Sequence, residues 1–451
     1  MASGITTDTK PKLPAHLMYN VAEQLIWLST DPSWKGWGVG SMEDFRTALP
    51  AWRLTCKDFA QMGIVKAALF KSLDLSAEAW NVDLIKNTEL TFLLPYVRKV
   101  VLRPSPYNLD LDFEDYKDLR SISNDAPSTH IEMATEYKSC RRRARRDKDL
   151  IFSGELERVW TRLFGQLQSP SGFVIDSLIG DHPLLPDSLP NSSSGDYDDY
   201  EDDRAILRSS SLTNYNDFFH AIVRCVATSK TKIKAVEVDC EMAHFFSGWK
   251  RDAWKELHLD SLQALRLHPC KFSVPEEHQE ERDDSLAEIL DHFLAKCPAT
   301  LESFFCEGNV IDPAPSMPLL KKYGIQNLRS IELCGLAIQV PDFSMDIAES
   351  PHLREIRLRF CCPVSDDDAE WKPLLDAIHH HSNVRRLEFE GVWNRNIYNL
   401  SFDFNLDPLL TVEGHLAAYK ASRHHNRGNL DLLLYLAKKG PWSEKLQGLY
   451  G

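Results

Sequence analysis

The feature that most constrains the fold is a short apolar template that recurs six times in the second half of the chain. Apolar residues occupy the first, fourth and sixth positions of each copy, and the copies begin at Ile233, Leu262, Leu301, Leu328, Leu353 and Val384. Apolar residues at alternate positions are typical of a half-buried strand. Helical patterns lie in the gaps, notably at 285–297 and 371–382. A short strand alternating with a helix predicts stacked units that bury their apolar side chains against one another.

The template resembles that of irregular leucine-rich repeats. The expected fold is therefore an α+β or α/β solenoid, with an array of short parallel strands and helices over 211–393. Residues 76–180 are predicted to supply its first strand, marked by Val97, Val100 and Leu102, and further helices. We expect 394–451 to cap the array, because AAYKASRHH and LDLLLYLAKKG in this segment favour helices.

Two segments hold too few apolar residues to join a core. Residues 1–12 are polar, and residues 181–210 are rich in proline, serine and acidic residues. Burial there cannot offset the loss of chain entropy, so both are predicted to be disordered, the second as an acidic, serine-rich loop.

Charge and cysteine usage narrow the class of protein. The net charge of −14 disfavours nucleic-acid binding, which requires clustered positive charge to displace counterions from phosphates. The ten cysteines form no C-x-x-C pair, which indicates reduced thiols. No apolar run resembles a signal sequence or a membrane span. We therefore expect an intracellular soluble protein of the cytoplasm, the nucleus or both, without membrane contact.

Residues 13–75 are predicted to form a small block of three helices. Leu13-Pro14 opens the block, and a glycine- and tryptophan-containing insert at 31–41 separates its first two helices. The later stretch LPAWRLTCKDF is followed by Leu69-Phe70. This arrangement resembles an F-box, and residues 96–121 resemble the segment that follows the F-box in many filamentous-fungal proteins of this kind.

The resemblance implies a division of labour. An F-box binds the Skp-type adaptor of an SCF-type cullin-RING ubiquitin ligase, and the repeats would hold a protein substrate for ubiquitination. The chain would act as a non-catalytic substrate receptor without a cofactor or metal. The adaptor-binding residues implied are Leu13, Pro14, Leu17, Val21, Leu25, Leu49, Trp52, Leu54, Cys56, Phe59, Leu69 and Phe70.

Substrate contact is expected on the strand face opposite the apolar template, because side chains alternate between the two faces of a strand. The candidate residues are Glu237, Asp239, Arg266, His268, Phe305, Glu332, Arg357, Arg359, Glu388 and Glu390. Their mixed charges and one exposed phenylalanine suit a protein surface better than a polyanion. The alternative for each residue is an ordinary solvated position.

Other motifs have simpler explanations. Residues His379, His380 and His381 cannot converge on one metal ion, because consecutive helical residues point about 100° apart; a helix end is expected there. RRRARR at 141–146 is either a nuclear import signal, a contact for acidic partners, or a solvated helix face. The alternative functions are a leucine-rich-repeat interaction scaffold without ligase function and, from a different class, an enzyme with titratable groups converging in one cleft.

Overall fold

The structure is a computed structural model of the 451-residue chain. It describes residues 63–105, 112–114, 116–117, 129–167, 172–176, 217–239, 252–268, 292–296, 300–308, 325–364, 371–394, 397–406, 409–421, 430–444 and 446. The predictions for residues 1–12, for most of the F-box-like block and for the loop at 181–210 lie outside these ranges.

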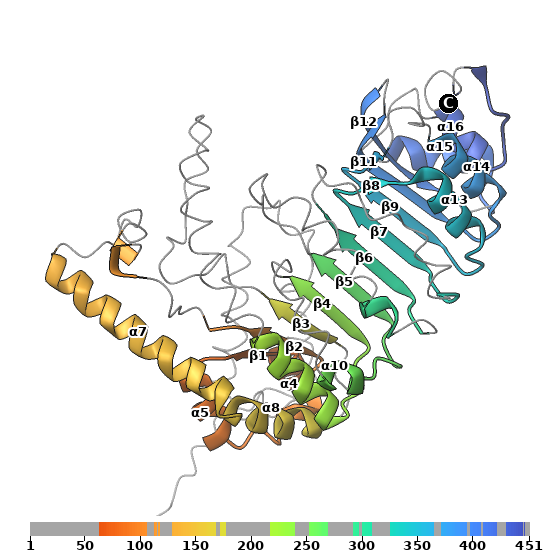
Figure 1. Cartoon of the computed structure of the whole chain (residues 1–451). Helices are drawn as coiled ribbons and strands as arrows, with labels where there is room; N and C mark the ends of the chain where they lie inside the picture. The colour runs from red at the N-terminus through yellow and green to blue at the C-terminus, as the bar shows by residue number, and fades with distance from the viewer. Residues whose placement is uncertain are drawn as a thin grey trace, which may run out of the picture.

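A single sheet of ten strands organises the described chain (Figure 1). In sheet order the strands are β1 (Ser72–Ser76), β2 (Lys99–Arg103), β3 (Gly172–Asp176), β4 (Ala235–Asp239), β5 (Ala264–His268), β6 (Ser303–Glu307), β7 (Ser330–Cys334), β9 (Glu355–Arg359), β11 (Arg386–Asn394) and β12 (Ile397–Asn405). Every pair is parallel except β11 with β12. The chain is thus α/β with a mostly parallel sheet, and the strands follow one another in chain order.

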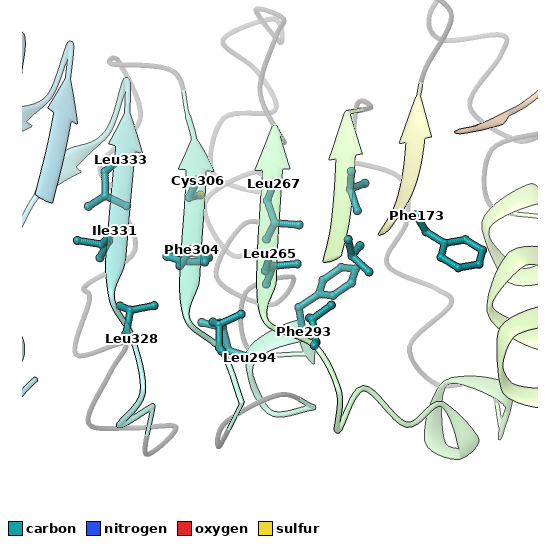
Figure 2. Close-up of a cluster of buried hydrophobic side chains, with 14 of the residues drawn as sticks. Phe173, Leu265, Leu267, Phe293, Leu294, Phe304, Cys306, Leu328, Ile331 and Leu333 are labelled. Atoms are coloured by element: carbon teal, nitrogen blue, oxygen red, sulfur yellow. The ribbon is translucent and has the colours of Figure 1, made fainter. Parts of the chain in front are cut away.

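Hydrogen-bond register aligns the six copies of the apolar template. Their fourth positions pair across β4 to β11, and their sixth positions pair in the same way. These residues are Val236, Leu265, Phe304, Ile331, Ile356 and Leu387 in one row, and Val238, Leu267, Cys306, Leu333, Leu358 and Phe389 in the other. All of them are buried. Figure 2 shows part of both rows with Phe293 and Leu294 beside them.

Three earlier strands extend the same rows toward the N-terminal end. Phe173 of β3 pairs with Val236 on one side and with Val100 of β2 on the other. Val100 in turn pairs with Leu73 of β1. The strand predicted around Val97 is therefore confirmed as β2. It is the second strand of the sheet and not, as predicted, the first, because the end of the block at 13–75 forms β1 instead of continuing as helix. Strand β3 was not predicted, because Pro170 stands where the six copies have an aliphatic residue at their first position.

Helices pack against the apolar face toward both ends of the sheet. The helices are α4 (Gly63–Leu69), α5 (Ala79–Asn87), α7 (His130–Phe152), α8 (Glu155–Gln166), a helical stretch over 217–229, α10 (Asp252–Glu256), α13 (Val340–Ala348), α14 (Lys372–His380), α15 (Val412–Ala421) and α16 (Leu430–Leu436), with a 3-10 turn, η2, at Leu94–Tyr96. Phe164 of α8 contacts Phe173, with ring centroids 5.1 Å apart. Trp371, the residue before α14, contacts Phe389 in the same edge-on manner at 5.5 Å. No described helix is both long and apolar enough to cross a membrane.

The C-terminal part combines expected and unexpected elements. Helix α16 lies where LDLLLYLAKKG predicted a helix, whereas α15 shares only 417–421 with the other pattern and begins earlier, at Val412. The segment also contains β12, which was not predicted and which turns back antiparallel to β11. Phe402 of β12 stacks on Phe389, with centroids 4.5 Å apart. A two-residue strand pair, β8 (Ala337–Ile338) with β10 (Cys362–Pro363), lies outside the main sheet.

Asp147 ties α7 to the start of α5. Its carboxylate accepts hydrogen bonds from the Ala79 backbone N–H (2.8 Å) and the Ser105 hydroxyl (2.6 Å). The Ala79 N–H is one of the helix-terminal donors that lack an intrahelical partner. Burial dominates the electrostatics and raises the pKa of Asp147 to about 6. This aspartate therefore acts as a long-range helix cap, from within the arginine-rich part of α7.

The raised pKa predicts a pH effect on stability. The folded state holds the Asp147 proton more tightly than the unfolded state, so its contribution falls as pH rises from about 4 to about 6, by about 2–3 kcal/mol. Asp147→Asn keeps an acceptor for Ala79 and removes this titration. Urea unfolding at several pH values should therefore show the variant gaining stability relative to wild type across that window. A constant difference between the two proteins would contradict the assignment.

Candidate protein-interaction face

The side chains opposite the apolar rows form what we call the open face. Its central row contains Glu237, Arg266, Phe305, Glu332, Arg357 and Glu388, which pair strand to strand in one register. A second row, at the carboxyl ends of the strands, contains His268, Glu307, Cys334, Arg359 and Glu390. Asp239 belongs to this row by its pairing with His268, but its side chain lies outside the described set. The sequence therefore placed these residues correctly on one face.

Two carboxylates organise the C-terminal half of the open face. Glu332 lies 3.5 Å from Arg357, 3.1 Å from Arg359 and 4.0 Å from Arg266. Glu388 lies 3.5 Å from Arg357 and 3.2 Å from Arg359. The Glu332 and Glu388 side chains are only 11% and 13% exposed. Because these carboxylates are more buried than the guanidinium groups, they hold the arginines in fixed positions at the surface.

The network continues to the last strand through residues that sequence reasoning missed. Arg386 donates two hydrogen bonds to Asp403 of β12, at 3.0 and 2.8 Å, and lies 3.2 Å from Glu388. The hydrogen bond to Asp403 raises the pKa of Arg386. Glu355 joins the network through Arg357 at 3.3 Å. Sequence reasoning missed Asp403 because it missed β12, whose register places Asp403 opposite Glu388 and one diagonal step from Arg386.

An aromatic group lies under the N-terminal half of the open face. The Arg266 guanidinium sits 4.9 Å from the Phe305 ring centroid, and the His268 ring lies 4.7 Å from it. Phe305 is only 7% exposed, so the prediction that it is an exposed phenylalanine was wrong. The long arginine side chain and the imidazole cover the ring. His268 is in turn 2.6 Å from Glu307 and 3.8 Å from Glu237.

The cysteine of the second row is not a nucleophile at neutral pH. Burial raises the pKa of Cys334 to about 11. The thiolate is the reactive form of cysteine, so the Cys334 thiol stays protonated and unreactive.

The strongly raised carboxyl pKa of Asp147 likewise belongs to a helix cap and not to a cleft. Within the described ranges, no group of three or more histidine, cysteine, aspartate or glutamate residues could hold a metal ion.

A tight turn follows several strands at the carboxyl edge of the open face. Gly335, Phe360 and Gly391 follow β7, β9 and the first half of β11 in this position, with φ of +62°, +51° and +61°. Backbone hydrogen bonds join each turn to the next strand: the Gly335 N–H donates to the Arg359 carbonyl (2.8 Å), and the Phe360 N–H donates to the Glu390 carbonyl (2.7 Å). Phe360 adopts a conformation that side chains rarely tolerate, and its ring covers Gly391 while staying 48% exposed.

This turn predicts a specific cost for Gly391→Ala. The added Cβ would lie 2.6 Å from Cδ1 of Phe360 in a left-handed backbone conformation, so we expect a loss of about 2 kcal/mol in unfolding free energy. Adding Phe360→Gly removes the ring that the new Cβ meets. The double variant should therefore regain the part of the lost free energy that is due to this clash, but not the part due to the left-handed backbone at position 391. Gly165→Ala in α8 is the control, since nothing lies within 4 Å of its added Cβ and the helix gains propensity. Equal effects at the two glycines in urea unfolding would refute this explanation.

The three consecutive histidines contact three different parts of the chain. Helix α14 ends at His380, as predicted. His379 stacks on Tyr435 of α16 at 4.1 Å, His380 bonds the Asp376 carbonyl at 2.7 Å, and His381 bonds the Ser350 carbonyl at 2.8 Å. His379 and His381 therefore attach the end of α14 to other parts of the chain, whereas His380 bonds within α14 itself.

Of the residues predicted to bind the adaptor, the structure describes only Leu69 and Phe70. Leu13, Pro14, Leu17, Val21, Leu25, Leu49, Trp52, Leu54, Cys56 and Phe59 lie outside the described residues. Leu69 ends α4, and the half-buried Phe70 leads directly into β1. The end of the F-box-like block is thus continuous with the first strand of the sheet.

Two comparisons with known proteins identified no relative of the chain. Neither a scan against protein-family models nor a search of curated proteins returned a match to the chain.

Proposed function

We propose that the chain is the substrate-receptor subunit of an SCF-type ubiquitin ligase. In this proposal residues 13–70 bind a Skp-type adaptor and, through it, the cullin scaffold. The open face holds a protein substrate in the cytoplasm or nucleus. The F-box-like order of residues in 13–70 supports the adaptor part. The repeated L-x-x-L-x-L template, whose copies lie in register in one parallel sheet, supports a leucine-rich-repeat interpretation of the rest.

The observation that carries the substrate part is the pre-organised charge on the open face. Arg357 and Arg359 are each held by more than one carboxylate, so ordering them on binding costs little further side-chain entropy. Their charges are also largely compensated, which disfavours a polyanion and favours a partner with matching charges of both signs. Arg266, which lies over the Phe305 ring, is of a residue type that is enriched at interface hot spots.

The mechanism would be proximity alone. A bound substrate would present its lysines to the conjugating enzyme at high effective concentration, without chemistry by the receptor's own side chains. The second candidate is an interaction scaffold that uses the same open face and binds no adaptor. Adaptor binding separates the two, and the insert at 31–41 is the sequence feature that favours the scaffold.

Adaptor binding gives the decisive test. Full-length chain co-expressed with the host's Skp-type adaptor should elute with it as a stoichiometric complex on size exclusion. Leu13→Ala/Pro14→Ala should abolish the complex, because the pair supplies the first anchor of the helical plug. Leu189→Ala/Pro190→Ala is the matched control, since it changes the same dipeptide in the acidic, serine-rich segment. A folded protein without bound adaptor would leave the scaffold, and loss of the complex in both variants would refute the anchor assignment.

A further inference from the structure

Helix α7 carries a solvent-exposed stripe that no other element of the described chain covers, and Lys148 of α7 itself lies 5.7 Å from the Phe152 ring centroid. The stripe consists of Ile131, Thr135, Lys138, Arg142, Arg145, Asp149 and Phe152, all of them exposed. Spacings that alternate between four and three residues keep such positions on one face of a helix. The opposite face carries the buried Ala144, Asp147 and Leu150. In Figure 1 the N-terminal half of α7 extends away from the sheet.

The centre of this α7 stripe is cationic and unpaired. Lys138, Arg142 and Arg145 make no ion pair with any residue in the described part of the chain. The neighbouring Arg146 behaves differently, since it contacts Asp83 of α5 at 2.7 Å. Three cations and one acidic residue, Asp149, give the stripe a positive net charge, in contrast with the net charge of −14 of the whole chain. The local field of the stripe therefore attracts negative charge.

Both ends of the α7 stripe are apolar. Ile131 is 79% exposed and Phe152 is 64% exposed, although side chains of this size gain free energy on burial. The two residues lie 21 positions apart, which corresponds to roughly 30 Å along a helix. A partner that covers both ends must therefore be an extended element of similar length.

From this pattern we infer that the α7 stripe docks an acidic helix of another protein, with carboxylates opposite the three cations and apolar residues opposite Ile131 and Phe152. Exposed ion pairs fix the register and the choice of partner, whereas the apolar ends supply most of the affinity. A nucleic acid fits less well, because three cations release few counterions and phosphates leave the apolar ends uncovered. The chain's own acidic run, Asp196–Asp203, is followed by Ile206 and Leu207, so this segment is the rival occupant that the test below distinguishes. This surface is separate from the open face and does not depend on the ligase proposal.

Fluorescence anisotropy with the full-length chain tests the inference. The probe is a labelled helical peptide of three heptads, with glutamates along its centre and leucines near both ends, and the comparison peptide has lysines in place of the glutamates. We expect the acidic peptide alone to bind, and to bind more weakly at high salt. Lys138→Glu/Arg142→Glu/Arg145→Glu should weaken binding at least about tenfold. Ile131→Ser/Phe152→Ser should also weaken it, without changing its salt dependence.

The matched control reverses three exposed cations elsewhere, Lys71→Glu/Arg98→Glu/Lys99→Glu, and should leave affinity within about twofold. Four results would overturn the inference: no binding of the acidic peptide, an equal loss in the control variant, tighter binding of single-stranded poly(U), or binding that appears only after the acidic residues of 196–203 are neutralised. The last result would assign the α7 stripe to the chain's own segment. Because every variant retains residues 13–70, adaptor co-elution reports on the ligase proposal independently.

Discussion

Glu332→Ala should destabilise the protein by about 3 kcal/mol, although the residue lies on the open face and not in the apolar core. Three guanidinium groups surround the Glu332 carboxylate, those of Arg266, Arg357 and Arg359. Its removal takes away the most buried carboxylate of the network and leaves Glu388 to face both Arg357 and Arg359. Loss of one partner from a buried ion pair costs about 3–5 kcal/mol, and the partial exposure of these arginines places the expectation at the lower end. Urea unfolding followed by circular dichroism measures the effect.

Glu390→Ala is the matched control for this prediction. Glu390 also faces Arg359, at 3.3 Å, but its side chain is 40% exposed. An exposed ion pair contributes about 0–1 kcal/mol, so this variant should unfold almost as wild type does. Glu332→Gln should fall between the two, because it keeps the volume and loses the charge. Similar losses in all three variants would mean that the network is not organised around Glu332.

Much of the sheet could be predicted because each strand repeats one local pattern. Leu265 and Leu267 share a face with Phe304 and Cys306 for the same reason that apolar residues alternate within each strand. Strand β3 escaped prediction because its copy has a proline at the first position. Strand β12 escaped because it reverses direction and belongs to no repeat, even though Leu400, Phe402 and Phe404 alternate along it.

The open face could be assigned residue by residue, but its interactions could not. Strand alternation places Glu332, Arg357 and Glu388 on one side of the sheet. Which arginine meets which carboxylate depends on side-chain conformations across three or more strands, and no local pattern encodes those. Phe305 shows the limit most clearly: its face was predicted, whereas its burial depends on Arg266 and His268 from the adjacent strand.

The largest effect of a single truncation is expected at Trp160 of α8. This side chain is fully buried and packs against Phe164 and Phe218, with ring centroids 6.2 and 5.9 Å away. Trp160→Ala removes the largest side chain of this cluster, and substitutions of this kind cost about 3–5 kcal/mol. Trp80→Ala in α5 is the control, because Trp80 is 58% exposed and should contribute within about 0.5 kcal/mol.

Trp160→Phe distinguishes packing from hydrogen bonding at the same position. The indole N–H of Trp160 is buried and meets no hydrogen-bond acceptor among the described residues, and an unsatisfied buried donor costs about 1–3 kcal/mol. Phenylalanine removes that donor and keeps an aromatic ring beside Phe218, so the gain offsets much of the lost volume. We therefore expect Trp160→Phe to unfold within about 1 kcal/mol of wild type. A loss as large as that of alanine would contradict this expectation and show that the volume of the full indole is needed at this position.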